Sequence, residues 1–124
     1  MRKRFFLSMV AVGIFITCGV AVAGPAIGIM ASIHNCQNAG LAPESRIEAC
    51  SQAIHTNLLS HGILAAVYYN RGVAYETAHD IDHARQDYDK ALELKPDFVQ
   101  AQASRARISA QNQATTVPPP AEVH

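Results

Sequence analysis

The sequence predicts an all-α protein built from antiparallel helical hairpins, and three observations support this class. From residue 44 to residue 110, apolar residues recur at steps of three and four, which is the spacing of one helix face. Short polar turns or a proline separate these amphipathic stretches. No strand-like alternation of apolar and polar residues occurs after residue 23. With 124 residues, the chain has room for one domain.

Residues 1–23 are predicted to be a signal peptide. Three cations between Met1 and Arg4 precede a long apolar run, so that the charged end stays cytoplasmic while the apolar part enters the translocon. Small residues at positions 21 and 23 suit a signal peptidase, and we expect cleavage before Gly24. The alternative is an uncleaved inner-membrane anchor over about residues 5–23, because apolar character continues as far as Ile33.

In either case the domain is expected outside the cytoplasm, in the periplasm, and its cysteines agree with that compartment. The segment after the signal keeps two of the three cysteines, Cys36 and Cys50. An even pair in an oxidising compartment favours a disulfide, with two free buried thiols or a functional thiol as the alternatives. The bond would close a loop of about 15 residues and contribute about 3 kcal/mol. It would hold the lead-in segment 24–42, which shows no clear period, over the first helix.

The charge balance argues against nucleic acid as a partner. The chain has 10 Lys and Arg against 10 Asp and Glu, and the signal contains three of the cations and none of the acids. The remainder therefore has seven cations against ten acids, a formal charge of −3. Because nucleic-acid binders need a clustered positive surface and these cations are scattered, the composition excludes that class.

The first predicted helix spans residues 44–59. Pro43 lies near its first position, where the missing N–H has no cost. Ser60 to Gly62 ends it. One apolar face contains residues at helical spacing: Ile47, Cys50, Ala53, Ile54 and Leu58.

Three further helices follow in order. The second is predicted at 63–78, and a short turn at His79 and Asp80 separates it from the third at 81–94. Lys95-Pro96 stops the third helix, since proline cannot continue the hydrogen-bond ladder. An alanine-rich fourth helix is expected at 98–110.

The helical domain is therefore predicted at residues 43–110. Residues 111–124 are polar and then rich in proline, with little to bury. They predict a disordered tail.

The segment from residue 65 to residue 96 resembles a tetratricopeptide repeat (TPR), a helix–turn–helix unit of about 34 residues. The repeat's usual leucine before its glycine is here Arg71. The resemblance implies a short solenoid of stacked hairpins. It also implies that seven residues pack the two helices together, with tyrosines against glycine and alanine: Tyr68, Gly72, Tyr75, Ala84, Tyr88, Ala91 and Pro96.

The flanking segments resemble half-repeats. Arg46 to Ile54 aligns with Ala84 to Leu92, so that Cys50 takes the position of Tyr88, and Val99 to Ile108 aligns with the next first helix. The expected domain is thus one full repeat between two halves. Because stacked repeats usually need three or more units, either the disulfide or self-association is expected to compensate.

For function, the resemblance implies a protein-binding module without catalytic activity or cofactor. In this family the first helices line a concave groove for a protein or peptide partner. Five positions of the repeat would face it, with ordinary exposed helix residues as the alternative: Ala66, Tyr69, Val73, Glu76 and Thr77. Some members grip a terminal carboxylate with lysine and asparagine, but Tyr69 and Val73 occupy those positions, so that activity is not implied.

A small enzyme or metal-binding protein is the alternative of a different class. His79 and His83 are four residues apart, but they span a turn, and Asp80 and Asp82 are interpreted as capping residues of the following helix. Cys50 with the histidines, such as His55, could act as a thiol–imidazole pair but lacks an orienting partner. The sequence therefore predicts neither catalytic nor metal-binding residues.

Overall fold

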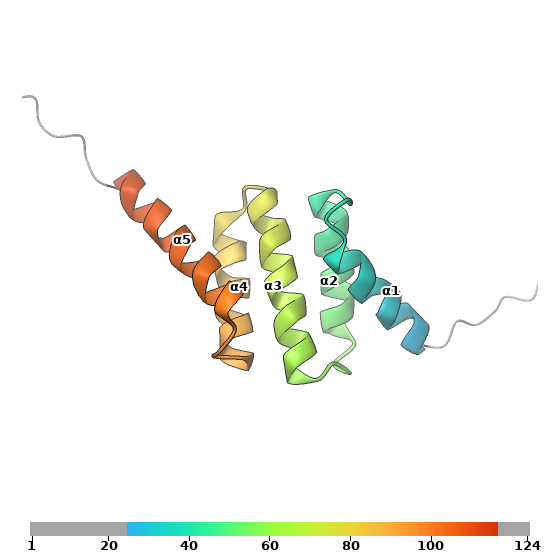
Figure 1. Ribbon diagram of the computed structural model, residues 1–124. Helices are drawn as coiled ribbons and strands as arrows, with labels where there is room; N and C mark the ends of the chain where they lie inside the picture. The colour runs from blue at the N-terminus through green and yellow to red at the C-terminus, as the bar shows by residue number, and fades with distance from the viewer. Residues whose placement is uncertain (1–24, 117–124) are drawn as a thin grey trace, which may run out of the picture.

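A computed structural model describes residues 25–116 and contains five helices and no strand within them (Figure 1). This confirms the all-α prediction. Figure 1 shows α3 in the middle, with α2 and α1 on one side and α4 and α5 on the other. The helices are α1 (Pro25–Gln37), α2 (Pro43–His55), α3 (His61–Thr77), α4 (Ile81–Leu94) and α5 (Val99–Thr116).

The first predicted helix is shorter than its apolar pattern suggested. α2 begins at Pro43 and ends at His55, whereas the pattern predicted helix as far as residue 59. The chain leaves the helix at Asn57, whose φ of 54° is left-handed. The Thr56 hydroxyl donates to the carbonyl of Ala53 at 2.7 Å and closes the last turn. Leu58 consequently lies 71% exposed instead of on the buried face.

Capping explains the turn between α3 and α4. His79 adopts a left-handed φ of 62°, which ends α3, and Asp80 then caps α4 by accepting a hydrogen bond from the His83 N–H at 3.3 Å. The His83 ring is 2.7 Å from the same carboxylate and lowers the pKa of Asp80. Asp82 lies in the first turn of α4, but the Asp80 side chain is the one that caps it.

The lead-in segment contains a helix that the sequence pattern did not indicate. α1 occupies Pro25–Gln37 within the segment 24–42 that was interpreted as lacking a period. Of its side chains, Cys36 is fully buried, while Ile33 is partly buried against the core formed with α2 and α3. Ile29 is also partly buried on the same face, but apolar residues occupy exposed positions of α1 too, such as Met30 and Ala31, so no single apolar stripe stands out in its sequence.

The last helix is longer than predicted. α5 continues to Thr116, six residues into the segment interpreted as a disordered tail. Alanine and glutamine are good helix formers, and the Thr115 hydroxyl bonds back to the carbonyl of Asn112 at 2.9 Å. Helix therefore reaches Thr116, the last described residue.

The predicted signal peptide or anchor and the proline-rich end of the tail lie outside the described residues. Within residues 25–116, no helix is both long and apolar enough to cross a bilayer.

Two small cores hold the helices together, and α3 contributes to both. The first lies among α1, α2 and α3 and contains both cysteines and Val67. The second lies among α3, α4 and α5 and centres on Tyr88 and Ile108, neither of which is accessible to solvent. α3 is thereby covered by neighbours on both sides.

Candidate functional site

Close contact between α3 and α4 fixes the central hairpin. A Cβ added at Gly72 would lie 2.8 Å from Cε1 of Tyr88 and 3.2 Å from the carbonyl oxygen of Ala84. Tyr88, Ala84 and Ala91 have no exposed surface, so the Tyr88 ring has no solvent-filled space into which it could rotate. The absence of a side chain at position 72 is what allows the two helices to approach.

The other packing residues lie at the edges of this contact. Tyr68 and Tyr75 are both partly buried, and the Tyr75 ring stacks on the His83 ring with centroids 5.0 Å apart. Pro96 follows the end of α4 and is exposed. The tyrosines of α3 therefore cover the rim of the interface, and Tyr88 of α4 fills its centre.

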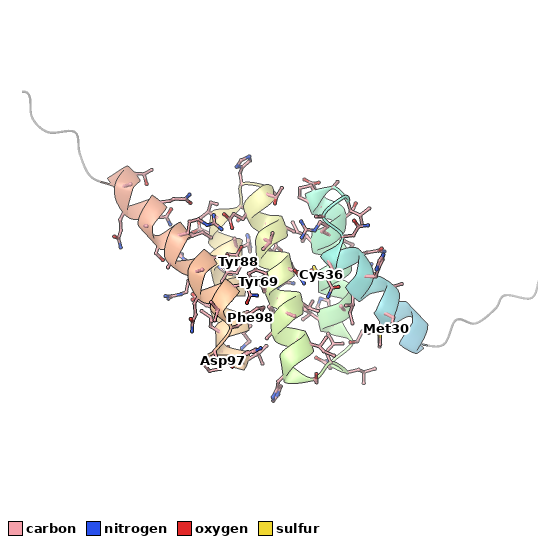
Figure 2. All side chains as sticks on the ribbon, in the orientation of Figure 1. Met30, Cys36, Tyr69, Tyr88, Asp97 and Phe98 are labelled. Carbon is pink, nitrogen blue, oxygen red and sulfur yellow. A yellow bond between two sulfur atoms is a disulfide. The ribbon has the colours of Figure 1, made fainter. Side chains whose placement is uncertain are left out.

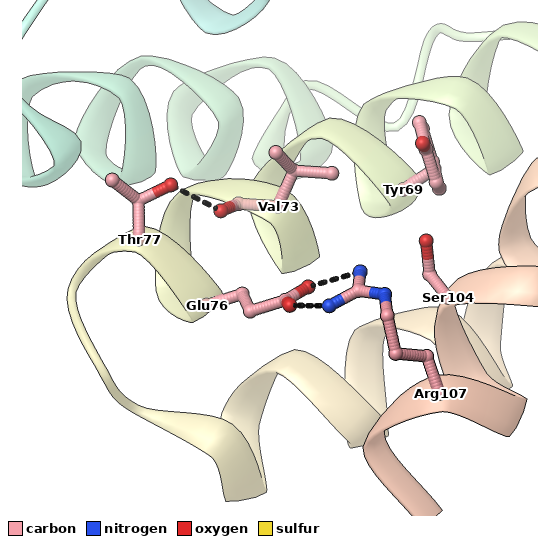
Figure 3. A pocket seen from close by; sticks show the side chains of 6 residues that line it. All are labelled: Tyr69, Val73, Glu76, Thr77, Ser104 and Arg107. Atoms are coloured by element: carbon pink, nitrogen blue, oxygen red, sulfur yellow. Dashed lines mark hydrogen bonds and ion pairs between the residues drawn. The ribbon is translucent and has the colours of Figure 1, made fainter. Parts of the chain in front are cut away.

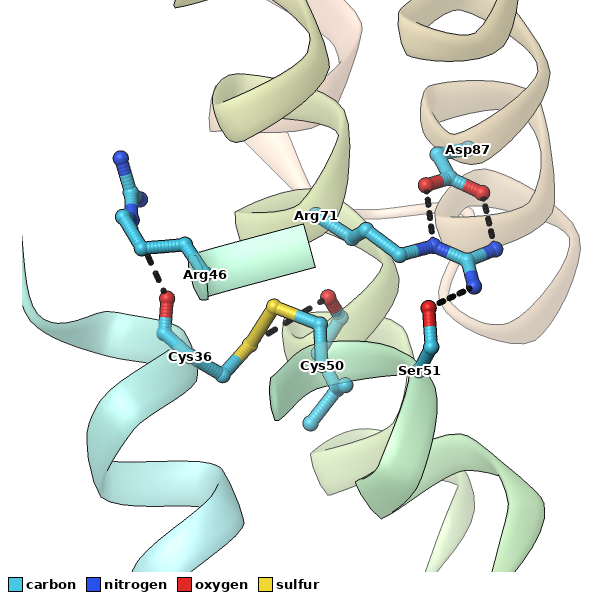
Figure 4. The surroundings of a disulfide bond; sticks show 7 residues. Cys36, Arg46, Cys50, Ser51, Arg71 and Asp87 are labelled. Carbon is cyan, nitrogen blue, oxygen red and sulfur yellow. Dashed lines mark hydrogen bonds and ion pairs between the residues drawn. A yellow bond between two sulfur atoms is a disulfide. The ribbon is translucent and has the colours of Figure 1, made fainter. Parts of the chain in front are cut away.

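Arg71, which departs from the repeat's usual leucine, connects three helices. Its guanidinium makes two hydrogen bonds to Asp87 of α4, at 2.7 and 2.8 Å, and a third to the Ser51 hydroxyl of α2 at 3.0 Å (Figure 4). It also lies over the rings of Tyr68 and Tyr75, 5.4 and 5.8 Å from their centroids. These contacts, led by the Asp87 hydrogen bond, raise the pKa of Arg71. The substitution therefore replaces an apolar contact with a satisfied polar one.

An open pocket of about 350 Å³ lies between α3 and α5 (Figure 3). Ala66, the remaining predicted groove position, is partly buried and does not line it. The sequence did not predict the residues from α5. Six residues line the pocket: Tyr69, Val73, Glu76 and Thr77 from α3, and Ser104 and Arg107 from α5.

The charges in this pocket neutralise each other. Both guanidinium nitrogens Nη1 and Nη2 of Arg107 bond to the Glu76 carboxylate, and the Tyr88 hydroxyl donates to the same carboxylate at 2.9 Å. The Arg107 hydrogen bonds lower the pKa of Glu76, with a smaller contribution from Tyr88. Burial, followed by the negative Glu76, raises the pKa of the Tyr88 hydroxyl. The pocket thus presents a matched ion pair with no net charge.

Aromatic contacts hold the other side of the pocket. The Tyr69 ring lies 5.7 Å from the Tyr88 ring and 5.1 Å from the Phe98 ring, between centroids (Figure 2). The Thr77 hydroxyl donates to the carbonyl of Val73 at 2.9 Å. These side chains are held in place by the protein itself, so the pocket has a defined shape without a ligand.

Cys36 and Cys50 form a disulfide in the structure, between α1 and α2 (Figure 4). The two Cα atoms are 4.7 Å apart, and neither residue has exposed surface. The Arg46 side chain donates to the carbonyl of Cys36 at 3.4 Å. α1 therefore lies on the face of α2 that Cys50 presents.

The residues of the enzyme or metal hypothesis do not form a common site. The sulfur of Cys50 is bonded to Cys36, so Cys50 has no thiol to pair with His55. His83 contacts Asp80 and Tyr75, while His79 lies exposed in the turn. Residues 25–116 contain no group of three His, Cys, Asp or Glu side chains placed to hold a metal ion.

Comparison with protein families gives a match to the tetratricopeptide repeat over residues 65–98. Comparisons with curated proteins and with solved structures give no match. The matched segment contains α3 from residue 65 onward, the turn, and α4, together with the contact of Gly72 and Tyr88. The chain therefore carries a tetratricopeptide repeat at residues 65–98.

Proposed function

We propose that the protein is an exported adaptor or scaffold that binds a protein or peptide partner and catalyses no reaction. The tetratricopeptide repeat indicates a protein–protein interaction module. The observation that carries the proposal is the preformed pocket between α3 and α5, in which an aromatic side chain stands opposite a neutral ion pair. Aromatic residues that are partly buried and held in this way are common at protein interfaces.

The chemistry of the pocket supports binding over catalysis. Its carboxylate, Glu76, is hydrogen-bonded to Arg107 and Tyr88, and its pKa is lowered, so it is a poor proton donor near neutral pH. The hydroxyls of Ser104 and Thr77 have no imidazole among the lining residues to activate them. The groups that remain can hold a side chain and orient a backbone.

Export is supported by the cation-plus-apolar N-terminus and by the disulfide, because disulfides persist in oxidising compartments. The alternative within the same class is a form anchored in the inner membrane by about residues 5–23. The intact mass of the protein purified from cells separates the two. A chain that starts at Gly24 supports the cleaved form, and a chain that retains Met1 supports the anchored form.

Site-specific photocrosslinking in intact cells tests the binding site. A photoreactive amino acid at position 69 is expected to form adducts with a protein partner, because it replaces the aromatic residue of the pocket. The matched control is Gln86, an exposed residue of α4 outside the pocket. Identical adducts at the two positions, or none at position 69, would contradict the proposed site.

A further inference from the structure

We propose that α1 and α2 form a second repeat unit in which the disulfide replaces the glycine–tyrosine contact, and that α1 thereby extends the binding groove. The groove part of this proposal rests on the function proposed above, whereas the repeat part does not. The family comparison matches residues 65–98 alone, so this assignment depends on contacts in the structure.

The contacts of Cys36 with α2 repeat those of Gly72 with α4. Gly72 faces two residues one turn apart, Ala84 and Tyr88. Cys36 likewise contacts Arg46 and Cys50, which are the aligned positions in α2. Four residues before Cys36, Ser32 bonds to Gln52 at 3.4 Å, and these two residues align with Tyr68 and Lys90 of the central hairpin. The register of α1 on α2 is therefore that of α3 on α4.

The contact between one unit and the next also repeats. Arg71 of α3 bonds to Ser51 of α2, and Arg105 of α5 bonds to Asp89 of α4. Arg105 follows Arg71 by one repeat, and Asp89 takes the aligned position of Ser51. Aligned positions in neighbouring units are also buried alike. Three aligned pairs have no exposed surface: Val67 with Ala101, Ala74 with Ile108, and Ala53 with Ala91. α2 thus lies against α3 as α4 lies against α5.

The disulfide compensates for side chains that this first unit lacks. At the position of Tyr88, Cys50 is too small to fill the space between two helices. Ile33, the position aligned with Tyr69, is partly buried against the first core, as Tyr69 is against the second. Cys36 is fully buried, and its bond to Cys50 joins α1 covalently to α2 where the central hairpin has a ring in close contact with a glycine.

In this register, residues of α1 take groove positions. Met30 aligns with Ala66 and is 68% exposed, and Ile33 aligns with Tyr69 (Figure 2 labels Met30 and Tyr69). On the other side, Arg107 of α5 aligns with Val73 and lines the pocket. Three first helices, α1, α3 and α5, therefore line one groove.

The groove's chemistry selects its occupant. Its charges, Glu76 and Arg107, are paired with each other, and the aligned positions on α1 carry no charge, since two are apolar, Met30 and Ile33, and the third is Gln37. A charged segment would lose hydration here without gaining a partner. The occupant is therefore an uncharged segment of a partner protein, with apolar side chains that meet Met30 and Tyr69.

The repeat assignment is tested by restoring the contact that the disulfide replaces. Cys36→Ser with Cys50→Ser is expected to lower Tm by about 10 °C or more, because the crosslink is lost. Cys36→Gly with Cys50→Tyr should recover at least half of that loss, since it recreates the pair formed by Gly72 and Tyr88. Cys36→Gly with Cys50→Ala is the matched control and should recover nothing. Equal Tm values for the tyrosine and alanine variants would overturn the assignment.

The groove extension is tested with a displayed library of random dodecapeptides, selected on the oxidised protein. Selected peptides should be depleted in charged residues and enriched in aliphatic and aromatic ones. Met30→Asp should then weaken their binding about tenfold, a loss of about 1.4 kcal/mol. The control Ala31→Asp should leave it unchanged, because Ala31 aligns with Val67, a position that faces the preceding second helix.

The outcomes separate the two proposals. If Tyr69→Ala abolishes peptide binding and Met30→Asp leaves it intact, the extension of the groove onto α1 is overturned. The proposed function stands in that case. Selected peptides rich in Asp, Glu, Lys or Arg would overturn the uncharged occupant. Binding unaffected by Tyr69→Ala would contradict the proposed function itself, and the Tm comparison would still decide the repeat assignment.

Discussion

Gly72 and Arg71 are adjacent residues of α3 that contribute to the α3–α4 interface in different ways. Gly72 lets Tyr88 approach because it has no side chain, whereas Arg71 reaches past that contact to Asp87 and Ser51. Asp87 is nearly buried, with 7% of its side chain exposed, so its charge needs the guanidinium. Arg71, which replaces the repeat's usual leucine, therefore links α3 to both α4 and α2 through its hydrogen bonds.

Replacing Gly72 with alanine is expected to destabilise the protein by about 1–3 kcal/mol, although alanine is the better helix former. The added Cβ would lie 2.8 Å from Cε1 of a Tyr88 ring that is fully buried and cannot move aside. Gly62→Ala is the matched control, because no atom lies within 4 Å of its Cβ position. Urea unfolding measures both, and equal free energies of unfolding would contradict the steric explanation.

Changing Arg71 to leucine, the usual residue of the repeat, is expected to cost about 1–3 kcal/mol because Asp87 is left buried without a partner. Adding Asp87→Ala should recover part of this loss, since it removes the unpaired charge and places the residue of the aligned position, Ala49. Chemical unfolding of both single variants and the double variant measures the coupling. Additive effects would show that the pair contributes nothing beyond its separate side chains.

At the scale of the element, the two end helices are attached by different means. α1 is joined to α2 by the disulfide, and α5 is held by Ile108 in the second core together with two ion pairs, Arg105 with Asp89 and Arg107 with Glu76. The attachment of α5 therefore depends on pH, and that of α1 depends on redox conditions.

The ion pair between α3 and α5 predicts a loss of stability in acid. The pKa of Glu76 in the folded protein lies below its unfolded value of 4.5, so its contribution is complete above that pH and is lost as pH falls through the folded pKa. Arg107→Gln should lower the free energy of unfolding by about 0.5–1 kcal/mol at pH 7 and by less near pH 3.

Urea unfolding at the two pH values measures this difference. The control is Arg85→Gln, which removes the exposed pair with Asp82 within α4. It should cost no more than a few tenths of a kcal/mol at pH 7, as for other exposed pairs one turn apart. An Arg107→Gln effect that is the same at both pH values would exclude the ion pair as its cause.

At the scale of the whole molecule, α3 is the helix on which the others depend, because it belongs to both cores. Repeat proteins of this kind are stabilised by each unit and by contacts between neighbours. Opening one end should therefore leave the central hairpin folded.

Hydrogen exchange in the presence of a reductant tests this. After reduction of Cys36 and Cys50, amides of α1 should lose protection while those of α3 and α4 keep it. Cys36→Ser with Cys50→Ser should give the same pattern without reductant. Simultaneous loss of protection in α3 and α4 would show that the disulfide holds the whole fold.

The sequence alone determined the α3–α4 hairpin and its family. Residues that pack there lie within one short segment, so the positions of Gly72, Ala84 and Tyr88 can be recognised from their spacing. The residue that caps the start of α4, Asp80, and the proline that follows its end, Pro96, can likewise be recognised from the sequence. Local patterns of this kind persist because each residue's neighbours in the fold are also close in the chain.

Only the tertiary structure decided what lies on either side of that hairpin. α1 has apolar residues at exposed positions such as Met30 as well as on its buried face, so no periodic pattern stands out, and its place depends on a bond between residues of two helices. The second wall of the pocket, Ser104 and Arg107, depends on how α5 lies against α3. A helical pattern fixes which residues share a face, but the partner of that face is set by packing between distant segments.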